Sequence, residues 1–363
     1  AIRHNNQAPV RQAGQKWEEA MTAGGPASIL RGAIGGMAIG LVLSACGASS
    51  AREADSHAAS DPAGVAAVIT VTILGSGTPM ASRTQAGAAI LVEAGSQKLL
   101  FDCGRSCTSR LAEYDLNIGQ QIDKLFLTHL HSDHVVGIPD LWLNGWTQGR
   151  KVPLQIWGPQ GTSEMLEGLR EAYSADLGYR NAGPGQPVPP ALENHVTPFA
   201  DEGGVVFDSD GVTVTAFRVT HAQIPAYGFR VDYNGKSVVI SGDTSATPNL
   251  AAYGAGADLV LLEVVSPAMA DALEDAYIPK MVEMILRLHL TPEQAGEVFA
   301  DISPALGVYY HTVTGCVSDK ELLEQTGRVY SGKVMVAHDL TRVRILPDSV
   351  ENEFLASENE ACD

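Results

Sequence analysis

The chain has 363 residues, enough for one large domain or two ordinary ones, and its 45% hydrophobic content is that of a globular protein. The formal net charge is −18, and residues 1–46 carry a small positive excess, so the remainder is at about −20. Such an acidic surface repels polyanions, because nucleic-acid affinity comes largely from Lys and Arg that displace counterions. We therefore expect no long RNA or DNA partner, whereas a small anionic substrate stays compatible with a local metal charge.

The first 46 residues have the pattern of a targeting segment. An uncharged run over residues 32–43 follows Arg31. It is shorter than the roughly 20 residues that cross a bilayer, but it suits the apolar region of a secretory signal. Residues 43–46, Leu-Ser-Ala-Cys, resemble the lipobox of bacterial lipoproteins. This resemblance implies a protein anchored in the bacterial periplasm or cell envelope by a lipid on Cys46; the alternative is an ordinary signal peptide with an incidental cysteine.

The remaining chain divides into three parts. Residues 47–66 are small and polar without an apolar period, which predicts a flexible linker. No linker interrupts residues 67–347, so we expect one domain there, followed by a loose acidic tail over residues 348–363.

Four further cysteines follow Cys46. Cys103 and Cys107 lie four positions apart, whereas Cys316 and Cys362 are distant. This spacing is not that of a zinc finger, and an exported protein could oxidise a pair, so the pairing stays open.

Strands and helices alternate along the domain. Apolar runs, β-branched or alternating, predict strands over residues 67–74, 88–92, 98–101, 124–128, 212–219, 226–233, 237–241, 259–263 and 307–310. Asn234 and Gly235 predict a type I′ hairpin between two of them. A helix is expected over residues 135–146, and another after Thr291, where Gln294 completes a capping box. The pattern predicts an α/β domain of layered sheets.

A cluster of metal-binding side chains follows the strand at residues 124–128. His129, His131, Asp133 and His134 offer three imidazoles and a carboxylate within six residues. Zinc favours these groups, and its hydrolytic sites keep one position for water. A loop leaving a strand can divide the four between two sites. The alternative, a solvated polar loop, is disfavoured because the chain has only ten histidines.

The His-x-His-x-Asp-His pattern resembles that of the metallo-β-lactamase superfamily. The family's other motifs match Asp102, His221, Asp243 and His311, each at a strand end, so that the resemblance extends over residues 69–345. It implies an α/β fold, an αββα sandwich in which two mixed β-sheets are flanked by helices. It also implies a dinuclear site for two Zn²⁺, although Mn²⁺ or Fe²⁺ would accept the same ligands.

The resemblance also implies a role for each ligand. His129, His131 and His221 would bind one metal, Asp133, His134 and His311 the other, and Asp243 would bridge them. A metal-bridging hydroxide would then attack the electrophile. Asp102 would either orient a ligand imidazole or cap a turn. His4, His57, His195 and His338 have no ligand context and are expected to be surface or packing residues.

Four stretches resemble the tRNase Z and arylsulfatase-like branch of the superfamily, at residues 74–79, 219–231, 241–244 and 289–295. In tRNase Z a histidine and a glutamate assist proton transfer to the leaving oxygen, and the matching positions here are His289 and Glu263. A histidine held by a carboxylate is a tunable acid. The alternative is that His289 merely precedes a helix. One position departs from the tRNase Z pattern, because Leu262 stands where that family has a histidine.

Two further features bear on the substrate. Long-armed tRNase Z enzymes carry an insertion between their third and fourth motifs, where this chain has the tight Asn234–Gly235 hairpin. Together with the charge and the lipobox, this favours hydrolysis of small phosphodiesters or sulfate esters over tRNA 3′-end cleavage. Trp142 and Trp146 could share a helix face and wall an aryl pocket, but such pairs more often belong to the core.

Three alternatives remain. The chain could be a β-lactamase-type or lactonase-type hydrolase of cyclic amides or esters, although β-lactamases usually lack the bridging carboxylate matched by Asp243. It could also be a metal-binding lipoprotein without activity, which the complete ligand set disfavours. The natural substrate and the oligomeric state are not readable from the sequence.

Overall fold

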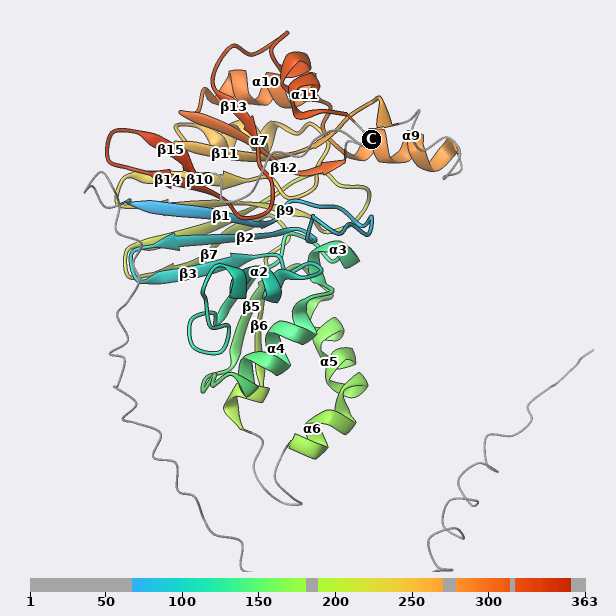
Figure 1. Ribbon diagram of the computed structural model, residues 1–363, viewed down its shortest axis with the longest axis vertical. Coiled ribbons are helices and arrows are strands. Elements are labelled where there is room, and N and C mark those ends of the chain that lie inside the picture. The colour runs from blue at the N-terminus through green and yellow to red at the C-terminus, as the bar shows by residue number, and fades with distance from the viewer. Residues whose placement is uncertain (1–66, 181–188, 270–278, 314–316, 354–363) are drawn as a thin grey trace, which may run out of the picture. The chain divides into compact units, whose positions relative to one another are not determined.

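A computed structural model describes residues 67–180, 189–269, 279–313 and 317–353 (Figure 1). The predicted targeting segment and linker, with Cys46, lie outside these residues, as do His4, His57, Cys316 and Cys362. Among the helices of the described part, none is long and apolar enough to span a membrane.

The first of two mixed sheets has the strand order β15-β14-β1-β2-β3-β4-β5-β6. Its pairs are antiparallel from β15 to β3 and parallel from β3 to β6. The strands are β1 (Ile69–Gly75), β2 (Ala89–Ala94), β3 (Gln97–Phe101), β4 (Lys124–Phe126), β5 (Leu154–Gly158), β6 (Asn194–Pro198), β14 (Thr341–Ile345) and β15 (Val350–Glu353).

The second sheet has the order β13-β12-β11-β10-β9-β8-β7. It is parallel from β13 to β10 and antiparallel from β10 to β7. The strands are β7 (Gly203–Ser209), β8 (Val212–Arg218), β9 (Tyr227–Tyr233), β10 (Lys236–Ile240), β11 (Leu259–Val265), β12 (Leu306–Val313) and β13 (Val334–Val336).

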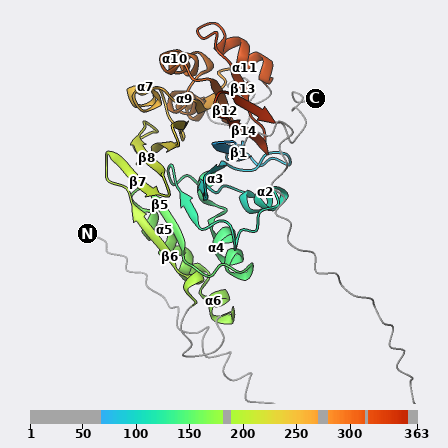
Figure 2. The ribbon, with the colours of Figure 1, turned by 90° about the vertical axis from the view of Figure 1, so that its left-hand side faces the viewer.

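Helices cover the outer face of each sheet (Figure 1; Figure 2). The helices that precede β6 in the chain are α2 (Cys107–Glu113), α3 (Ser132–Val135), α4 (Ile138–Thr147), α5 (Thr162–Ala172) and α6 (Ser174–Arg180) and the 3-10 helix η1 (Pro190–Leu192). The helices that follow β10 are α7 (Pro248–Gly254), α9 (Pro279–Leu288), α10 (Pro292–Ile302) and α11 (Asp319–Thr326). The predicted αββα sandwich of two mixed sheets flanked by helices is confirmed.

Successive side chains of a strand point to opposite faces of its sheet, which gives three apolar layers. Ile69, Val71 and Ile73 of β1 and Val238 and Ile240 of β10 share the cluster between the sheets. The intervening residues face outward, as Val239, Val260 and Leu262 do where they pack with α7 and α10. Because strand side chains have a period of two, one strand can contribute to the central layer and to an outer layer at once.

Aromatic rings join the two sheets directly beneath the functional loops. Phe101 and Phe126, the last residues of β3 and β4, lie with ring centroids 5.1 Å apart. Phe229 of the other sheet contacts both, at 5.1 and 6.1 Å. Burying each such ring stabilises the fold by about 1.5–3 kcal/mol. This packing fixes the points at which residues 102 and 128 leave their strands.

Two differences from the sequence expectations have physical reasons. The helix expected over residues 135–146 is broken into α3 and α4 at Gly137, where a Cβ would lie 2.3 Å from the Gly104 carbonyl oxygen. The tail expected to be loose from residue 348 instead contributes β15, where Glu353 pairs with Arg342 and Arg344. Trp142 is fully buried and donates to the Leu192 carbonyl, so the expectation that it belongs to the core is confirmed.

The cysteines that the structure describes, Cys103 and Cys107, are both free and buried.

Candidate metal centre

Strand direction brings the predicted ligands to one edge of the domain. β3 and β4 are parallel, and β10, β11 and β12 are parallel, while two antiparallel steps give β8 the direction of β10. Asp102, His129, His221 and Asp243 follow the carboxyl ends of β3, β4, β8 and β10, and His311 lies near the end of β12. Ligands in open α/β sheets bind at this edge.

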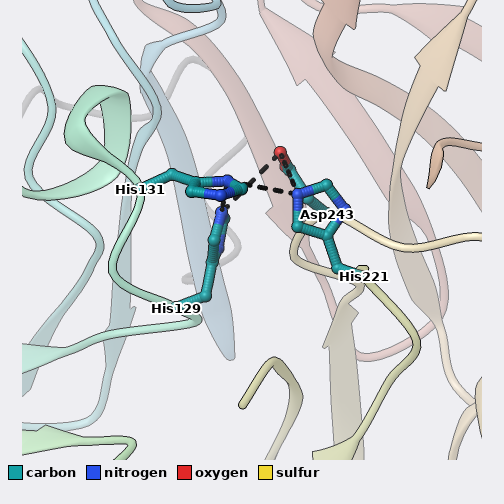
Figure 3. A group of neighbouring side chains, drawn as sticks. All are labelled: His129, His131, His221 and Asp243. Carbon is teal, nitrogen blue, oxygen red and sulfur yellow. Dashed lines mark hydrogen bonds and ion pairs between the residues drawn. The ribbon is translucent and has the colours of Figure 1, made fainter. Parts of the chain in front are cut away.

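The first cluster consists of His129, His131 and His221 (Figure 3). Nδ1 of His131 lies 2.9 Å from Nε2 of His129 and 3.2 Å from Nε2 of His221. Oδ2 of Asp243 lies 3.9 Å from Nε2 of both His129 and His221. Three imidazole nitrogens and one carboxylate oxygen therefore face a common point.

The second cluster consists of Asp133, His134 and His311. Oδ2 of Asp133 lies 3.1 Å from Nε2 of His311 and 3.6 Å from Nε2 of His134. The other oxygen of Asp243, Oδ1, lies 3.4 Å from Nε2 of His134 and 3.4 Å from Nδ1 of His311. Each Asp243 oxygen thus faces a different cluster, which is the geometry of a bridging ligand.

These residues fit a pair of divalent cations. Within the described part of the chain, His134 Nε2, Asp243 Oδ1 and His311 Nδ1 are buried and lack a hydrogen-bond partner. Leaving such a polar atom buried and unpaired costs about 1–3 kcal/mol. A bound cation would satisfy all three at once, and imidazole with carboxylate is a donor set that zinc accepts.

Burial and charge prepare three of the ligands, His129, His221 and Asp243, for metal binding, whereas Asp243 and Asp102 overcome burial and raise the pKa of His134 well above its ordinary value. Burial lowers the pKa of His129 well below its ordinary value and that of His221 to about 4, which leaves both rings neutral. Burial alone would raise the pKa of Asp243, but His311 and His134 hold it well below its usual range. Neutral imidazoles and an ionised carboxylate are the forms that bind metals.

Hydrogen bonds behind the ligands fix their orientation. Asp102 Oδ2 lies 2.8 Å from Nδ1 of His134 and accepts from the Thr128 hydroxyl at 2.8 Å, while its Oδ1 accepts from Thr128 N. Asp102 therefore contacts a ligand imidazole, as the first of the two expectations has it, whereas its bonds to Thr128 join the ends of two strands and do not cap a turn. The Thr128 hydroxyl contacts His129 Nδ1 at 2.9 Å, and His221 Nδ1 contacts the Leu288 carbonyl at 3.2 Å. Such contacts set the tautomer of a ligand imidazole.

A buried acid–base pair adjoins both clusters. Nδ1 of His289 lies 3.0 Å from Oε2 of Glu263, whose other oxygen accepts from Leu290 N at 2.8 Å. The His289 ring centroid is 5.0 Å from that of His221, and ligand atoms of His289, Asp243 and His311 lie within 4.8 Å of one another.

His289 and Glu263 shift each other's pKa. Burial alone would lower the pKa of His289, but the Glu263 carboxylate raises it to about 9. Burial raises the pKa of Glu263, and His289 opposes that shift. With a pKa of about 9, His289 is protonated at neutral pH when no metal is bound.

The structure brings together every residue that the sequence nominated for the site. His195 is exposed on β6, and His338 is buried and contacts Asp319, so neither belongs to it. Sequence reasoning missed Thr128 and the Leu288 carbonyl. Thr128 had a usable signal, since it directly precedes the ligand motif, whereas a backbone carbonyl has none.

Comparisons with known proteins agree with this geometry. A family model described as the β-lactamase superfamily domain matches residues 97–312. A ribonuclease Z of Mycobacterium sp. (strain KMS) is 34% identical over 286 residues, which is 77% of this chain and 97% of the relative.

Solved structures show the same fold. A metallo-β-lactamase fold protein of Bacillus subtilis has a TM-score of 0.58 at 19% identity, covering 76% of this chain and 98% of the other. The short form of human tRNase Z has a TM-score of 0.57 at 23% identity, covering 76% of this chain and 99% of the other.

The expectation that no nucleic acid is a partner is wrong, because the curated relatives that span this chain's domain are named ribonuclease Z. Net charge misled because it sums over the whole chain and says little about one edge of two sheets. The β9–β10 hairpin is as tight as expected. Helices α5 and α6 lie between β5 and β6 in the chain, and no residue of α6 is buried.

The matched family model, the identity to the relatives and the shared fold together show that this chain belongs to the metallo-β-lactamase superfamily of metal-dependent hydrolases, with ribonuclease Z-like homologues.

Proposed function

We propose that this protein is a metal-dependent phosphodiesterase that cleaves RNA. The observation that carries the proposal is the buried His289–Glu263 pair, whose histidine adjoins the two ligand clusters. Cleavage of an RNA phosphodiester expels a sugar oxygen, a poor leaving group that must gain a proton. A protonated imidazole at this place supplies that proton. The ribonuclease Z names of the relatives support the same substrate class.

Each group of residues has a distinct part in the proposed reaction. His129, His131 and His221 would hold one cation, Asp133, His134 and His311 the other, and Asp243 would contact both. Bound divalent cations make a water nucleophilic at neutral pH and offset the charge that develops on phosphoryl oxygens.

The other half of the reaction belongs to the acid–base pair. His289 would donate its Nε2 proton to the leaving oxygen, because its Nδ1 faces Glu263. Glu263 would hold the ring in that orientation and keep it charged before transfer. Thr244 N and Leu290 N both donate to Glu263 Oε1, which fixes the carboxylate in turn.

A second candidate is a hydrolase of small phosphodiesters or sulfate esters. The tight β9–β10 hairpin favours it, because the chain has no insertion at that point to bind the rest of a long RNA. The same two clusters would serve either substrate, and only the groups that bind the rest of the substrate would differ.

A substrate panel on zinc-reconstituted protein separates these functions. The substrates are a stem-loop RNA with a 3′ trailer, bis-(p-nitrophenyl) phosphate, p-nitrophenyl sulfate, nitrocefin and a lactone. We expect cleavage of the RNA and of the phosphodiester, with both lost in Asp243→Ala. His195→Ala is the matched control, since His195 is an exposed histidine of the same domain.

The outcomes are exclusive. Turnover of bis-(p-nitrophenyl) phosphate or the sulfate ester without the RNA would replace the first candidate by the second. Hydrolysis of nitrocefin or the lactone alone would refute both. RNA cleavage that persists in Asp243→Ala would refute the metal centre itself.

A further inference from the structure

The carboxylate of Asp339 is hydrogen-bonded to a segment of the chain that contacts the backbone at or beside two of the ligands. Oδ1 accepts from Ser76 N and from the Ser76 hydroxyl, both at 2.9 Å. Oδ2 accepts from Ala86 N at 2.7 Å and from Arg110 Nε at 2.9 Å. Asp339 is only 5% exposed, so four donors satisfy a buried charge. A buried carboxylate with this many partners holds them firmly in place.

The segment that Asp339 holds, residues 76–86, contacts the backbone beside His311. Thr312 N donates to the Ser76 carbonyl at 3.2 Å. His311 itself has a φ of 47°, a left-handed conformation that a residue other than glycine adopts at a cost of order 1–2 kcal/mol. Such a conformation persists only where the surroundings impose it. The hydrogen bond from residue 312 to Ser76 is part of those surroundings.

The other end of the segment contacts the backbone of Asp133. Gly77 N donates to the Ala86 carbonyl at 2.8 Å, which closes the segment on itself. At the next residue, Gly87, a Cβ would lie 2.7 Å from the Asp133 carbonyl oxygen, so the two backbones are in close contact. Asp339 therefore holds a loop that packs behind both Asp133 and His311.

His129, His131 and His221, the ligands of the other cluster, take part in none of these contacts of Asp339 and of residues 76–86. The hydrogen bonds of Asp339 therefore stabilise the backbone of the cluster of Asp133, His134 and His311.

On this geometry, and resting on the metal centre of the proposed function, we propose that Asp339 is a positioning residue for the cluster of Asp133, His134 and His311. Its carboxylate fixes the segment 76–86, and this segment sets the backbone of two ligands of that cluster. Asp339 touches neither the cations nor the substrate. Its loss should weaken one metal site and spare the other.

The test measures zinc affinity, without any substrate. Metal-free protein is titrated with zinc against a chromophoric chelator, which gives a dissociation constant for each site. Asp339→Asn should weaken one constant by about 10–100-fold, the range found when a group behind a ligand is lost, and leave the other within about threefold. In an Asp133→Ala background, where the second cluster is already incomplete, the same substitution should leave the remaining constant unchanged.

Two further variants keep the test decisive. Asp319→Asn is the matched control, because it removes a side-chain contact to the neighbouring His338 without touching the segment, and both constants should stay as in the wild type. Should Asp339→Asn not fold, Ser76→Ala removes one of the four donors and should weaken the same site by a smaller factor.

The proposal is overturned if both constants weaken equally, if neither changes, or if the remaining site weakens in the Asp133→Ala background. A wild-type protein that binds no zinc refutes the metal centre and this inference with it. A protein that binds two zinc ions but leaves RNA intact refutes only the proposed substrate.

Discussion

Replacing Glu263 by Gln tests whether His289 acts as the leaving-group acid. The substitution keeps the side-chain volume and an oxygen that can accept from Leu290 N, but it removes the charge 3.0 Å from the imidazole. Glu263 is fully buried, so its carboxylate acts on His289 with little screening by solvent. The pKa of His289, about 9 beside the carboxylate, should fall to its ordinary value near 6.5 or below.

The size of the effect follows from the fraction of His289 that is protonated. At pH 7.5 a group with a pKa of about 9 is about 97% protonated, whereas one at 6.5 is about 9% protonated. The loss in kcat should therefore be roughly tenfold at pH 7.5 and roughly 75-fold at pH 8.5. Because the acid must carry its proton, the rate of the wild type falls as pH rises through the His289 pKa. In Glu263→Gln that fall begins about 2.5 pH units lower. Bound cations lower both pKa values, so the shift between the two proteins is the quantity to compare.

The assay is the pH profile of kcat for the RNA substrate and for bis-(p-nitrophenyl) phosphate, with zinc content measured in parallel. The nitrophenolate leaves without a proton, so its profile should change little. An alkaline limb at the same pH in Glu263→Gln and the wild type would refute the acid role. Loss of zinc from the variant would instead make Glu263 and His289 part of the metal site.

Three further predictions address other parts of the molecule. Asp102→Asn should lower zinc affinity by about 10–100-fold in chelator competition, since His134 loses the carboxylate that orients it; unchanged affinity would contradict this. Trp142→Ala should cost about 3–5 kcal/mol of unfolding free energy in urea while kcat of the folded enzyme stays unchanged, and a drop in kcat would restore the aryl-pocket reading. Cys46→Ala should abolish incorporation of labelled palmitate and release the protein from the membrane fraction; labelling that survives would reject the lipobox.

Strands β1 to β4 and β8 to β12 were readable from the sequence because each carries a strong local pattern. The uninterrupted apolar run at residues 259–262 and the hairpin at Asn234 and Gly235 need no distant partner to be recognised. The interior strands β5 and β14 and the edge strands β6, β7, β13 and β15 were not predicted. β6 alternates weakly between half-buried and exposed positions, and β13 has only three residues. Neither segment therefore shows a hydrophobic alternation that would predict a strand.

The site was predictable to the extent that its chemistry lies in side chains near strand ends. The ligand motif at residues 129–134 is local, and the resemblance supplied the distant ligands. The support behind the ligands was not predictable, because it runs between backbone groups and across long separations. Asp339 and Ser76 are 263 positions apart, and the Leu288 carbonyl that contacts His221 has no counterpart in side-chain chemistry.

The incorrect prediction about nucleic acid shows that the charge at the metal centre, and not the net charge of the chain, determines how a phosphodiester binds there. Asp102, Asp133, Asp243 and Glu263 are all buried around one edge of the two sheets. Without cations their negative charge is offset only in part, by protonated imidazoles such as His289, whereas two divalent ions carry about as much positive charge as the four carboxylates carry negative. The potential that meets a scissile phosphate is therefore set by metal occupancy, which no count of Lys, Arg, Asp and Glu includes. The acidic remainder of the surface acts at longer range, where salt screens it within about 8–10 Å. An acidic protein can thus attract a phosphodiester at its metal centre while binding the rest of a polyanion weakly.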